Sequence, residues 1–468
     1  MDKIKFGTDG WRAIIGEQYT VTNVARVSFA VAAWLKDKGI ASPKVIIGHD
    51  CRFNGDLFQE TAVKVLLDQG IEVLMAEGFV STPMVSLGAQ THKADLGIVI
   101  TASHNPPAYN GYKLKASYGG PLAPELVQEI QDIIPDTISD SFKAVSLEGA
   151  KAAGALKVVE LEKEYINRVK ESFDIAAIAN SPLKLAYDPM YGAGQNVLKK
   201  LFDHIVHIHD DYNPSFLGTA PEPIAKNLKE LEKLVVEQNI HCALATDGDA
   251  DRIGLYNANG SFVDSHHIIL LLIHYLVKYR GLTGKVVTAF SCTPRIAKMC
   301  EHYGLEHETV KIGFKYVAGK MVTEDVLLGG EESGGIATKD HIPERDGIWM
   351  GLIIWEFMAK SGKTLDELIK EVYEIVGPFQ FERNDLHIDE ALKQTIVENC
   401  KQNKYKSFGD YQVERVETID GFKFFFKDER WVMIRPSGTE PVLRVYAEAP
   451  TMEEVREILK VTEATIKS

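Results

Sequence analysis

Short apolar runs alternate with longer amphipathic segments over residues 1–376, which is the pattern of strands and helices that follow one another along a chain. Alternation at this spacing is typical of βαβ units with largely parallel sheets. The strands that it predicts are 44–48, 71–76, 96–100, 183–187, 205–209, 242–246, 285–290, 308–312 and 326–328, and helices are predicted at 55–69 and 82–92.

The pattern changes after Gly377-Pro378, where apolar runs follow one another closely enough to be antiparallel strands. Asp420-Gly421 has the composition of a hairpin turn. Thr451-Met-Glu-Glu454 and Thr364-Leu-Asp-Glu367 each match a capping box that opens a helix. The strands predicted here are 413–419, 422–426, 431–435 and 442–447. We therefore predict a small, separate α+β domain at the C-terminal end.

Each of the three α/β blocks closes with an apolar strand that leads into a polar loop: TASHNP (101–106), DGDADR (247–252) and GGEESGG (329–335). This repetition indicates three related domains that face one cleft. The small, polar stretch 139–156 is the predicted first linker. The predicted fold class is α/β, with three similar α/β domains of mixed, largely parallel sheets around a central cleft and a C-terminal α+β domain with an antiparallel sheet. The predicted domains are 1–145, 155–255, 256–375 and 376–468.

Composition limits the kind of protein. A chain of 468 residues is too long for one core and indicates three or four domains. A formal net charge of −14 argues against a nucleic-acid partner, but leaves room for a small phosphorylated ligand. The longest apolar stretches, such as 268–273, are too short for a membrane span, and the N-terminal residues lack a signal peptide's apolar centre. Five scattered cysteines without a CxxC pair favour reduced thiols in a cytoplasmic setting and no structural zinc.

TASHNP follows the predicted strand 96–100 and contains Pro106, with Pro107 next, so no helix can continue there. Ser103 is therefore predicted to lie on a loop at the carboxyl end of a strand, where open α/β sheets bind ligands. Taken alone, the hexapeptide also fits an ordinary polar turn.

DGDADR places Asp247, Asp249 and Asp251 at alternate positions, so that in an extended segment their carboxylates share one side. Such close like charges repel one another unless a cation lies among them, and hard oxygen ligands suit Mg²⁺. A calcium loop of the EF-hand type is excluded, because Arg252 and Ala258 stand where glycine and glutamate are required. A phosphatase loop with Asp247 as nucleophile and a solvated acidic turn remain as alternatives.

The other loops carry groups that bind anions or hydroxyls. RPSGTEP (435–441) can form an anion cradle from Ser437-Gly438-Thr439, with Arg435 and Arg444 as phosphate donors, and it lacks the P-loop pattern. GGEESGG offers Glu331 and Ser333 to sugar hydroxyls, and FGTDGWR contributes Arg12. Gly192-Ala-Gly194 begins a dinucleotide fingerprint, but Val197 stands at the third glycine position, so NAD binding is set aside.

Together these loops supply a nucleophilic hydroxyl, a metal triad, a hydroxyl-binding acid and a phosphate cradle, which is what phosphoryl transfer needs. A Ser-His hydrolase is the weaker interpretation. No GxSxG elbow surrounds Ser103, and in an extended loop the side chains of Ser103 and His104 point to opposite sides.

In this order, TDGWR, TASHNP, DGDADR, GGEESGG and RPSGTEP make the whole chain resemble the α-D-phosphohexomutase superfamily of phosphoglucomutases and phosphomannomutases. The resemblance implies interconversion of hexose 1-phosphate and hexose 6-phosphate by a phosphoserine at Ser103. It also implies Mg²⁺ held by phospho-Ser103, Asp247, Asp249 and Asp251, and hexose 1,6-bisphosphate as intermediate and activator.

The resemblance further implies roles for individual residues. Lys113, after the hairpin-like turn Asn110-Gly111, matches a lysine proposed for proton transfer, and to act as a base it would need a lowered pKa. The residues with implied catalytic roles are Ser103, His104, Lys113 and Arg12. Those with implied roles in substrate binding are Arg252, Lys315, Glu331, Ser333, Arg435, Ser437, Gly438, Thr439 and Arg444.

The GGEESGG loop bears on the preferred sugar. Gly335 stands where the bifunctional mannose/glucose enzymes and the phosphoglucosamine mutases have histidine. EES, Gly313-Phe-Lys315 and Arg345-Asp-Gly347 are similar to glucose-preferring phosphoglucomutases. We therefore expect glucose, with phosphomannomutase or phosphoglucosamine mutase as the alternative. A metal-dependent sugar phosphatase and a non-catalytic sugar-phosphate binding protein are less favoured, and the oligomeric state is left open.

Overall fold

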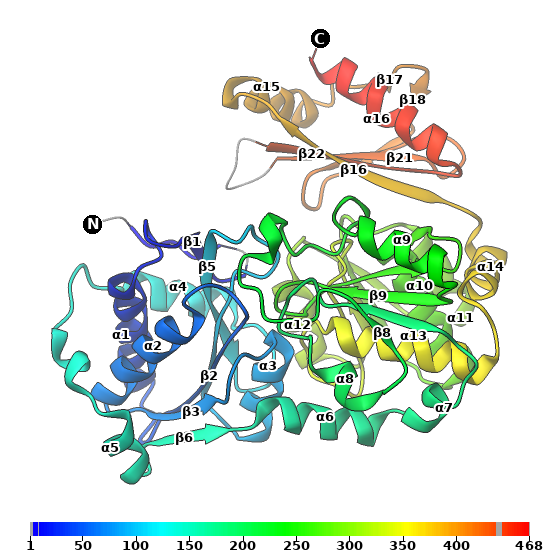
Figure 1. Cartoon of the computed structure of the whole chain (residues 1–468). Helices are drawn as coiled ribbons and strands as arrows, with labels where there is room; N and C mark the ends of the chain where they lie inside the picture. The colour runs from blue at the N-terminus through cyan, green and yellow to red at the C-terminus, as the bar shows by residue number, and fades with distance from the viewer. Residues whose placement is uncertain (1–2, 8, 437–441, 468) are drawn as a thin grey trace. The chain divides into compact units, whose positions relative to one another are not determined.

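A computed structural model of the chain describes residues 3–7, 9–436 and 442–467 (Figure 1). The chain divides into two compact units, the first formed by residues 1–287 and 313–369 and the second by residues 288–312 and 370–468. The domain boundaries predicted from the sequence divide the chain more finely and stay a prediction. Among the described residues, no helix combines the length and the hydropathy needed to span a membrane. All five cysteines are buried thiols.

The first sheet is mixed, with the strand order β1-β5-β4-β2-β3-β6. Strands β4, β2, β3 and β6 run parallel, whereas β5 is antiparallel to both β4 and β1. Helix α3 begins with Ser81, whose hydroxyl accepts the Met84 N–H, and Pro83 fits its first turn. The strands are β1 (Trp11–Ile14), β2 (Lys44–His49), β3 (Glu72–Ala76), β4 (Leu96–Ile100), β5 (Tyr109–Ala116) and β6 (Leu156–Val159). The helices are α1 (Val21–Asp37), α2 (Gly55–Asp68), α3 (Thr82–Thr91), α4 (Pro124–Asp132), α5 (Leu147–Ala152) and α6 (Leu161–Ser172).

The second sheet has the order β11-β10-β9-β7-β8, with β8, β7 and β9 parallel and β10 and β11 antiparallel. Every residue of β9 is buried, as the continuous apolar run 242–246 predicts. The strands are β7 (Leu185–Asp188), β8 (Val206–His207), β9 (Cys242–Thr246), β10 (Ile253–Asn257) and β11 (Phe262–Val263). The helices are α7 (Ile175–Ala179), α8 (Val197–Leu201) and α9 (Lys229–Gln238).

The third sheet has the order β13-β12-β14-β15, and the chain passes from the first compact unit into the second within β12. Helix α13 is apolar on all sides and largely buried, and the Asp346 side chain caps its N-terminus. Helix α14 is opened by the predicted capping box, in which Thr364 and Glu367 each accept the other's backbone N–H. The strands are β12 (Lys285–Ala289), β13 (His307–Val310), β14 (Val326–Gly330) and β15 (Ile336–Thr338). The helices are α10 (Ser265–His274), α11 (Arg295–Tyr303), α12 (Phe314–Thr323), α13 (Gly347–Ser361) and α14 (Leu365–Val376).

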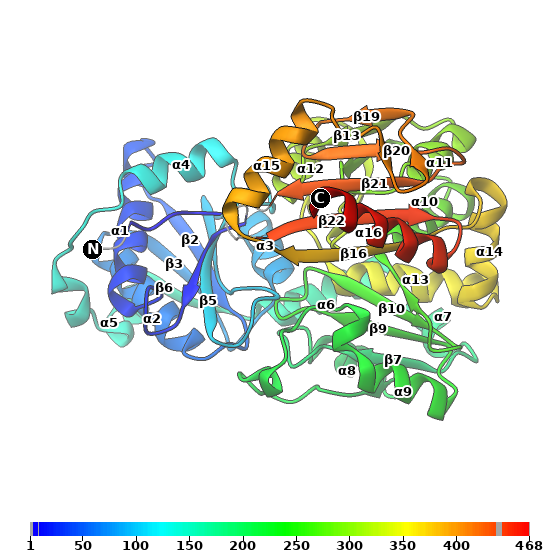
Figure 2. The same ribbon diagram turned by 90° about the horizontal axis from the view of Figure 1, so that it is seen from above.

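The fourth sheet lies in the second unit and is antiparallel throughout, as predicted, with the order β16-β22-β21-β20-β19 (Figure 2). Asp420-Gly421 lies in the loop between β19 and β20, where the hairpin was expected. The strands are β16 (Gln380–His387), β17 (Ser407–Phe408), β18 (Tyr411–Gln412), β19 (Arg415–Glu417), β20 (Phe422–Phe425), β21 (Trp431–Pro436) and β22 (Val442–Ala449). The helices are α15 (Glu390–Lys401) and α16 (Met452–Lys467).

One local prediction was wrong. Asn110-Gly111 is not a hairpin turn, because both residues lie inside β5 and pair with β1. Asn110-Gly111 has the composition of a turn although both residues pair within a sheet. The stretch 139–156, predicted as the first linker, holds α5 and leads into β6, which extends the first sheet beside β3, and its role as a linker stays a prediction.

The three predicted loops share a position in the fold. TASHNP joins β4 to β5, DGDADR joins β9 to β10, and GGEESGG joins β14 to β15, and each pair of strands is antiparallel. Each loop therefore follows the carboxyl end of a buried strand, as expected. The strand after the loop then runs back antiparallel to the first.

Candidate active site

Ser103 lies at the tip of the loop between β4 and β5, with its side chain fully buried. Its φ of 52° is in the left-handed region, which is strained for a residue other than glycine. Its backbone N–H donates to Thr101 Oγ1 at 2.9 Å, and its Oγ donates to Asp247 Oδ2 at 2.7 Å. The loop therefore brings the serine hydroxyl directly onto the acidic loop of the second sheet.

The side chains of Ser103 and His104 do not point to opposite sides, contrary to the prediction. His104 Nδ1 lies 3.4 Å from Ser103 Oγ, because the loop turns at Ser103 rather than running extended. Burial, followed by the nearby cations Arg252 and Arg12, holds the pKa of His104 well below its usual value. His104 is therefore a neutral imidazole beside the serine hydroxyl.

Asp247, Asp249 and Asp251 are all buried, and their carboxylates offer ligand atoms within 4.8 Å of one another. The predicted convergence is confirmed, although its cause differs. The loop is a tight turn with Ala250 at φ 57°, not an extended segment. Asp251 N–H and Arg252 N–H both donate to Asp247 Oδ1, at 2.9 Å and 3.1 Å, which fixes this turn.

The acidic triad fits a divalent cation. Asp249 Oδ1 and Asp251 Oδ1 are buried and have no hydrogen-bond partner among the described residues. Burial and the neighbouring carboxylates of Asp249 and Asp251 raise the pKa of Asp247 well above its usual value. Orphaned carboxylate oxygens and mutual repulsion are what a bound Mg²⁺ would relieve.

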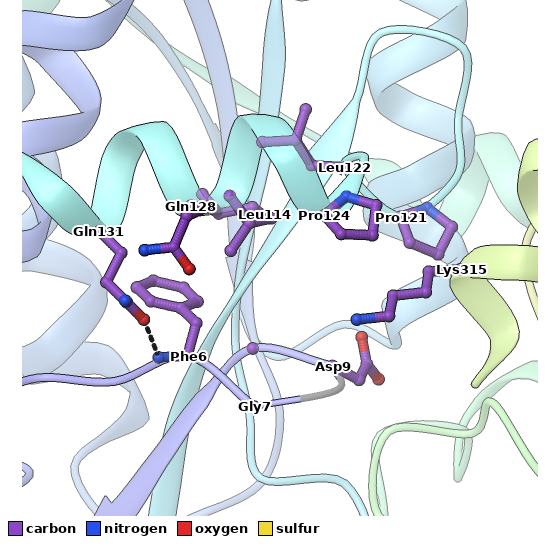
Figure 3. A pocket seen from close by; sticks show the side chains of 12 residues that line it. Phe6, Gly7, Asp9, Leu114, Pro121, Leu122, Pro124, Gln128, Gln131 and Lys315 are labelled. Carbon is purple, nitrogen blue, oxygen red and sulfur yellow. Dashed lines mark hydrogen bonds between the residues drawn. The ribbon is translucent and has the colours of Figure 1, made fainter. Parts of the chain in front are cut away.

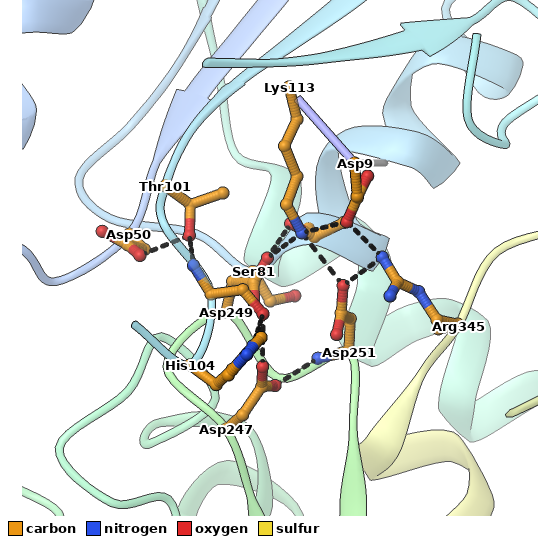
Figure 4. A network of polar contacts seen from close by, with 12 residues as sticks. Asp9, Asp50, Ser81, Thr101, His104, Lys113, Asp247, Asp249, Asp251 and Arg345 are labelled. Atoms are coloured by element: carbon orange, nitrogen blue, oxygen red, sulfur yellow. Dashed lines mark hydrogen bonds and ion pairs between the residues drawn. The ribbon is translucent and has the colours of Figure 1, made fainter. Parts of the chain in front are cut away.

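Lys113 connects the acidic loop to the N-terminal segment (Figure 4). Its Nζ lies 2.7 Å from Asp249 Oδ2, 3.0 Å from Asp251 Oδ2 and 2.9 Å from Asp9 Oδ2. Burial alone would lower the pKa of Lys113, but the carboxylates of Asp249, Asp251 and Asp9 raise it well above its usual value. The lowered pKa that a base at this position would need is therefore not found, and the surrounding carboxylates favour the charged form of Lys113.

Several residues of this network had not been predicted. The Arg345 guanidinium pairs with Asp9 at 2.5 Å and with Asp251 at 2.7 Å. Thr82, at the N-terminus of α3, donates its hydroxyl proton to Asp249 Oδ2 at 2.5 Å. Asp9 lies in TDGWR and Arg345 in RDG, so both motifs had been noted, but nothing in the sequence shows that their charges meet.

Two predicted arginines lie close to these loops. Arg12, on β1, donates to Asn105 Oδ1 of the serine loop at 2.7 Å. Arg252 follows the acidic triad, and its guanidinium lies 3.7 Å from Glu222. Both are therefore positioned to place positive charge beside Ser103.

Glu331 is 5% exposed, and its Oε1 accepts the Gly313 N–H at 3.0 Å. Burial raises its pKa to about 7, although Arg345 acts in the opposite direction. Ser333 is half-buried in the same loop. A Cβ at Gly335 would lie 2.3 Å from Arg345 Cδ, so the space that a histidine side chain would need is filled by Arg345.

Lys315, near the start of α12, lines a pocket of about 150 Å³. Figure 3 shows its ammonium pointing across the pocket toward the Asp9 carboxylate. Phe6, Leu114, Pro121 and other residues of the first unit form the rest of the wall. Lys315 therefore faces open space, where a ligand can reach it.

Arg435 and Arg444 lie in the second unit and are paired directly across β21 and β22. Like charges directly opposite each other in a sheet repel, so this pair favours an anion between them. Asp420 lies 3.3 Å from the Arg435 guanidinium, and Arg444 Nε is buried with no hydrogen-bond partner within the described part of the chain. Ser437, Gly438 and Thr439, the predicted cradle, lie outside the described residues.

Comparison with known protein families matches this chain along most of its length. Four domains of the phosphoglucomutase/phosphomannomutase family match in order: α/β/α domain I over 3–140, domain II over 163–260, domain III over 264–376 and the C-terminal domain over 389–464.

Individual relatives match over nearly the whole chain. A phosphoglucomutase/phosphomannomutase of Thermococcus kodakarensis is 30% identical, over 97% of this chain and 96% of the relative. A phosphoglucosamine mutase of Limosilactobacillus reuteri is 32% identical, over 97% and 96%. The crystal structure of a Thermus thermophilus protein described as a phosphomannomutase superposes with a TM-score of 0.88 at 31% identity, covering 100% of both chains.

Matches of this extent define a phosphohexomutase, which is an isomerase that transfers phosphate intramolecularly. The chain belongs to the phosphoglucomutase/phosphomannomutase family of the α-D-phosphohexomutase superfamily.

Proposed function

We propose that this phosphohexomutase interconverts glucose 1-phosphate and glucose 6-phosphate by means of a phosphoryl group carried on Ser103. The observation that carries the proposal is the contact between Ser103 Oγ and Asp247 Oδ2 at the buried acidic triad. A hydroxyl held on a strained loop against three carboxylates is positioned for group transfer rather than for folding alone.

In the first half-reaction, the oxygen of a sugar hydroxyl forms a bond to phosphorus as the bond from phosphorus to Ser103 Oγ breaks, and in net terms the hydroxyl proton passes to Ser103 Oγ. The product is a hexose 1,6-bisphosphate, which returns its other phosphoryl group to Ser103 in the second half-reaction. Lys113 Nζ lies 2.7 Å from Asp249 and 3.0 Å from Asp251, where its positive charge is placed to support the negative charge of the transferred group. Arg12 and Arg252 add positive charge near Ser103, and neutral His104 is within reach of a phosphoryl oxygen.

Asp247, Asp249 and Asp251, together with an oxygen of phospho-Ser103, are the groups that would hold Mg²⁺. The bound cation would neutralise charge on the transferred phosphate. Glu331, Ser333 and Lys315 are proposed to bind the sugar or its phosphate. Arg435, Arg444 and the 437–439 cradle are proposed to bind a substrate phosphate.

Glucose is proposed as the sugar because Gly335 and Arg345 together replace the histidine of the mannose and glucosamine enzymes. The names of the relatives support the alternative about equally, since they include a phosphoglucosamine mutase and a phosphomannomutase. A phosphatase with Asp247 as nucleophile is less well supported. Both carboxylate oxygens of Asp247 accept hydrogen bonds, from Ser103 Oγ and from the Asp251 and Arg252 N–H groups.

The test is a substrate panel with purified protein, Mg²⁺ and catalytic glucose 1,6-bisphosphate. It compares kcat/KM for the 1-phosphates of glucose, mannose, glucosamine and ribose while free phosphate is monitored. Preference for glucose without phosphate release supports the proposal, whereas preference for another sugar keeps the mutase but overturns the argument from Gly335. Ser103→Ala should abolish turnover, and Ser28→Ala, which removes a buried hydroxyl bonded to Tyr112, should retain it. Net phosphate release that survives Ser103→Ala would establish the phosphatase instead.

A further inference from the structure

The buried side chain of Arg52 lies directly beneath the serine loop. It follows β2, is 0% exposed, and donates to four backbone carbonyls, three in that loop and one at the first residue of β5. Its NH2 lies 2.6 Å from Ser103 O and 2.7 Å from Asn105 O, and its NH1 lies 3.0 Å from both Pro106 O and Tyr109 O. Only the planar fork of a guanidinium can donate to so many acceptors at once; an ammonium is a compact point charge.

Asp50 reaches the same serine from its other side. Its Oδ2 accepts the Thr101 hydroxyl at 2.5 Å, and Thr101 Oγ1 accepts the Ser103 N–H at 2.9 Å. Asp50 also pairs with Arg52, with 3.2 Å between Oδ2 and Nε, and accepts the Arg52 backbone N–H at 2.9 Å. Arg52 of this buried ion pair therefore holds the C=O of Ser103 directly, and Asp50 holds the N–H of Ser103 through the Thr101 hydroxyl.

These hydrogen bonds hold the serine at the point where its backbone is strained. A positive φ in a residue other than glycine persists only where the surroundings over-determine it, and here they do so through five hydrogen bonds. The Phe216 ring, which lies between β8 and α9 in the sequence, is 5.0 Å from the Arg52 guanidinium. Neither Asp50 nor Arg52 bonds to Ser103 Oγ, so the pair acts on the backbone of the loop and leaves the hydroxyl free for chemistry.

We propose that Asp50 and Arg52 are positioning residues for phosphoryl transfer, which hold Ser103 so that its Oγ stays against the acidic triad. The inference rests on the proposed role of Ser103 as the phosphoryl carrier. The same oxygen must give up and take back a phosphoryl group in each cycle, so the loop has to keep its geometry while the charge on Oγ changes. A displacement of about 1 Å in such a group can reduce the rate about 100-fold.

The test compares Arg52→Lys with a matched control, Arg26→Lys. Arg26 is 2% exposed in the same unit and also donates to a backbone carbonyl, that of Pro135 at 2.6 Å, but away from the serine loop. We expect Arg52→Lys to lower kcat for glucose 1-phosphate at least 30-fold with KM within threefold. We expect Arg26→Lys to lower the melting temperature about as much as Arg52→Lys does, but to keep kcat within threefold.

Thr101→Val provides a second variant with a smaller structural change, because it removes only the link between Asp50 and the Ser103 N–H. It should lower kcat at least tenfold with KM unchanged, and it decides the question if Arg52→Lys does not fold. The proposal is overturned if the folded Arg52 variant, or Thr101→Val in its place, keeps wild-type kcat, or if Arg26→Lys loses as much kcat as Arg52→Lys. Intact mass and turnover of the wild-type protein are measured first. A wild type with neither phosphoserine nor mutase activity refutes the proposed function itself, whereas an active wild type beside an unaffected variant refutes only the positioning role.

Discussion

Gly335 lacks a side chain at a point where Arg345 needs the space. Arg345 is 4% exposed and paired with Asp9 and Asp251, so its Cδ, 2.3 Å from the ideal Cβ of residue 335, cannot move without disturbing those pairs. We expect Gly335→Ala to lower kcat at least tenfold, because the displaced guanidinium no longer neutralises the acidic loop. Steady-state kinetics measures this change.

Gly319→Ala is the control for that substitution. It lies inside α12, where a Cβ meets no atom within 4 Å, and alanine is the better helix former by about 1 kcal/mol. It should raise the melting temperature slightly and leave kcat unchanged. A Gly335→Ala enzyme as active as the Gly319→Ala enzyme would contradict the role assigned to Arg345.

His209 gives the structure a pH dependence. Its hydrogen bond to Asp188, together with Glu230, raises its pKa from 6.5 to about 9. The protonated form is the one stabilised by folding, so its contribution is complete below about pH 6.5 and is lost as the pH rises through about 9. His209→Gln should therefore cost about 1 kcal/mol at pH 6, allowing for solvent screening, and nothing at pH 10.

Urea unfolding at the two pH values measures this difference. The control is His204, which is exposed and lies just before β8. Within the described part of the chain His204 has no hydrogen bond or ion pair to a carboxylate, so His204→Gln removes none. Equal losses of stability at pH 6 and pH 10 for His209→Gln would contradict the prediction.

The site residues that the sequence could predict are those whose motif carries the chemistry by itself. Ser103 and the three aspartates are of this kind, because a proline-bounded loop and alternate carboxylates have few other uses. Arg345, Asp9 and Arg52 could not be found in this way. Their role comes from contacts across the fold, such as the 336 residues that separate Arg345 from Asp9. Lys113 shows the same limit, because its partners, which set its pKa, lie 136 and 138 residues away.

At the scale of elements, the apolar strands β4 and β9 were predictable and the polar strand β5 was not. Strands β4 and β9 match their predicted residues because continuous apolar runs at the centre of a sheet are buried on both faces. Strand β5 was missed, since Asn110, Lys113 and Lys115 make it polar. Those residues are buried because they are satisfied by the carboxylates and backbone of the site, which propensity does not register.

The reciprocal capping box of α14 carries a prediction at this scale. Thr364 Oγ1 accepts the Glu367 N–H, and Glu367 Oε2 accepts the Thr364 N–H. Thr364→Ala should destabilise the protein by about 1 kcal/mol, because the Glu367 N–H loses its acceptor, Thr364 Oγ1. Calorimetry measures the shift, which should be a few degrees at most.

Thr323→Ala is the matched substitution. The Thr323 hydroxyl only bonds back to carbonyls of its own helix α12, an interaction that adds little to stability. It should change the melting temperature by less than Thr364→Ala does. The reverse order would show that the box contributes nothing to α14.

For the whole molecule, periodicity and length were enough to predict several domains with an antiparallel sheet at the C-terminal end, because these properties sum over many residues. The compact units follow contacts instead, so residues 288–312 group with the C-terminal residues rather than with their neighbours in sequence. The chemistry is divided in the same way. Ser103, Lys113 and the acidic triad belong to the first unit, and Arg435 and Arg444 to the second.

Because the acidic triad belongs to the first unit alone, stabilisation by Mg²⁺ can be tested by asking which unit it protects. A cation that binds only the folded triad stabilises the unit that holds it, by about 2.7 kcal/mol at 100 times Kd. Hydrogen exchange with Mg²⁺ and with a chelator should therefore differ for peptides over 101–113 and 246–253, with slower exchange in Mg²⁺. Peptides over 390–436 in the second unit should be unaffected, and the chelator should abolish mutase turnover reversibly.

Two variants separate binding at the triad from other effects. Asp251→Asn removes a ligand and should abolish the protection by Mg²⁺. Asp188→Asn alters an equally buried carboxylate that ends β7 and pairs with His209, so it should weaken the fold but keep the protection. Protection that survives Asp251→Asn, or that extends equally over both units, would place the cation elsewhere. In that case the orphaned oxygens of Asp249 and Asp251 would need another partner, for which the Arg345 and Lys113 cations are the nearest candidates.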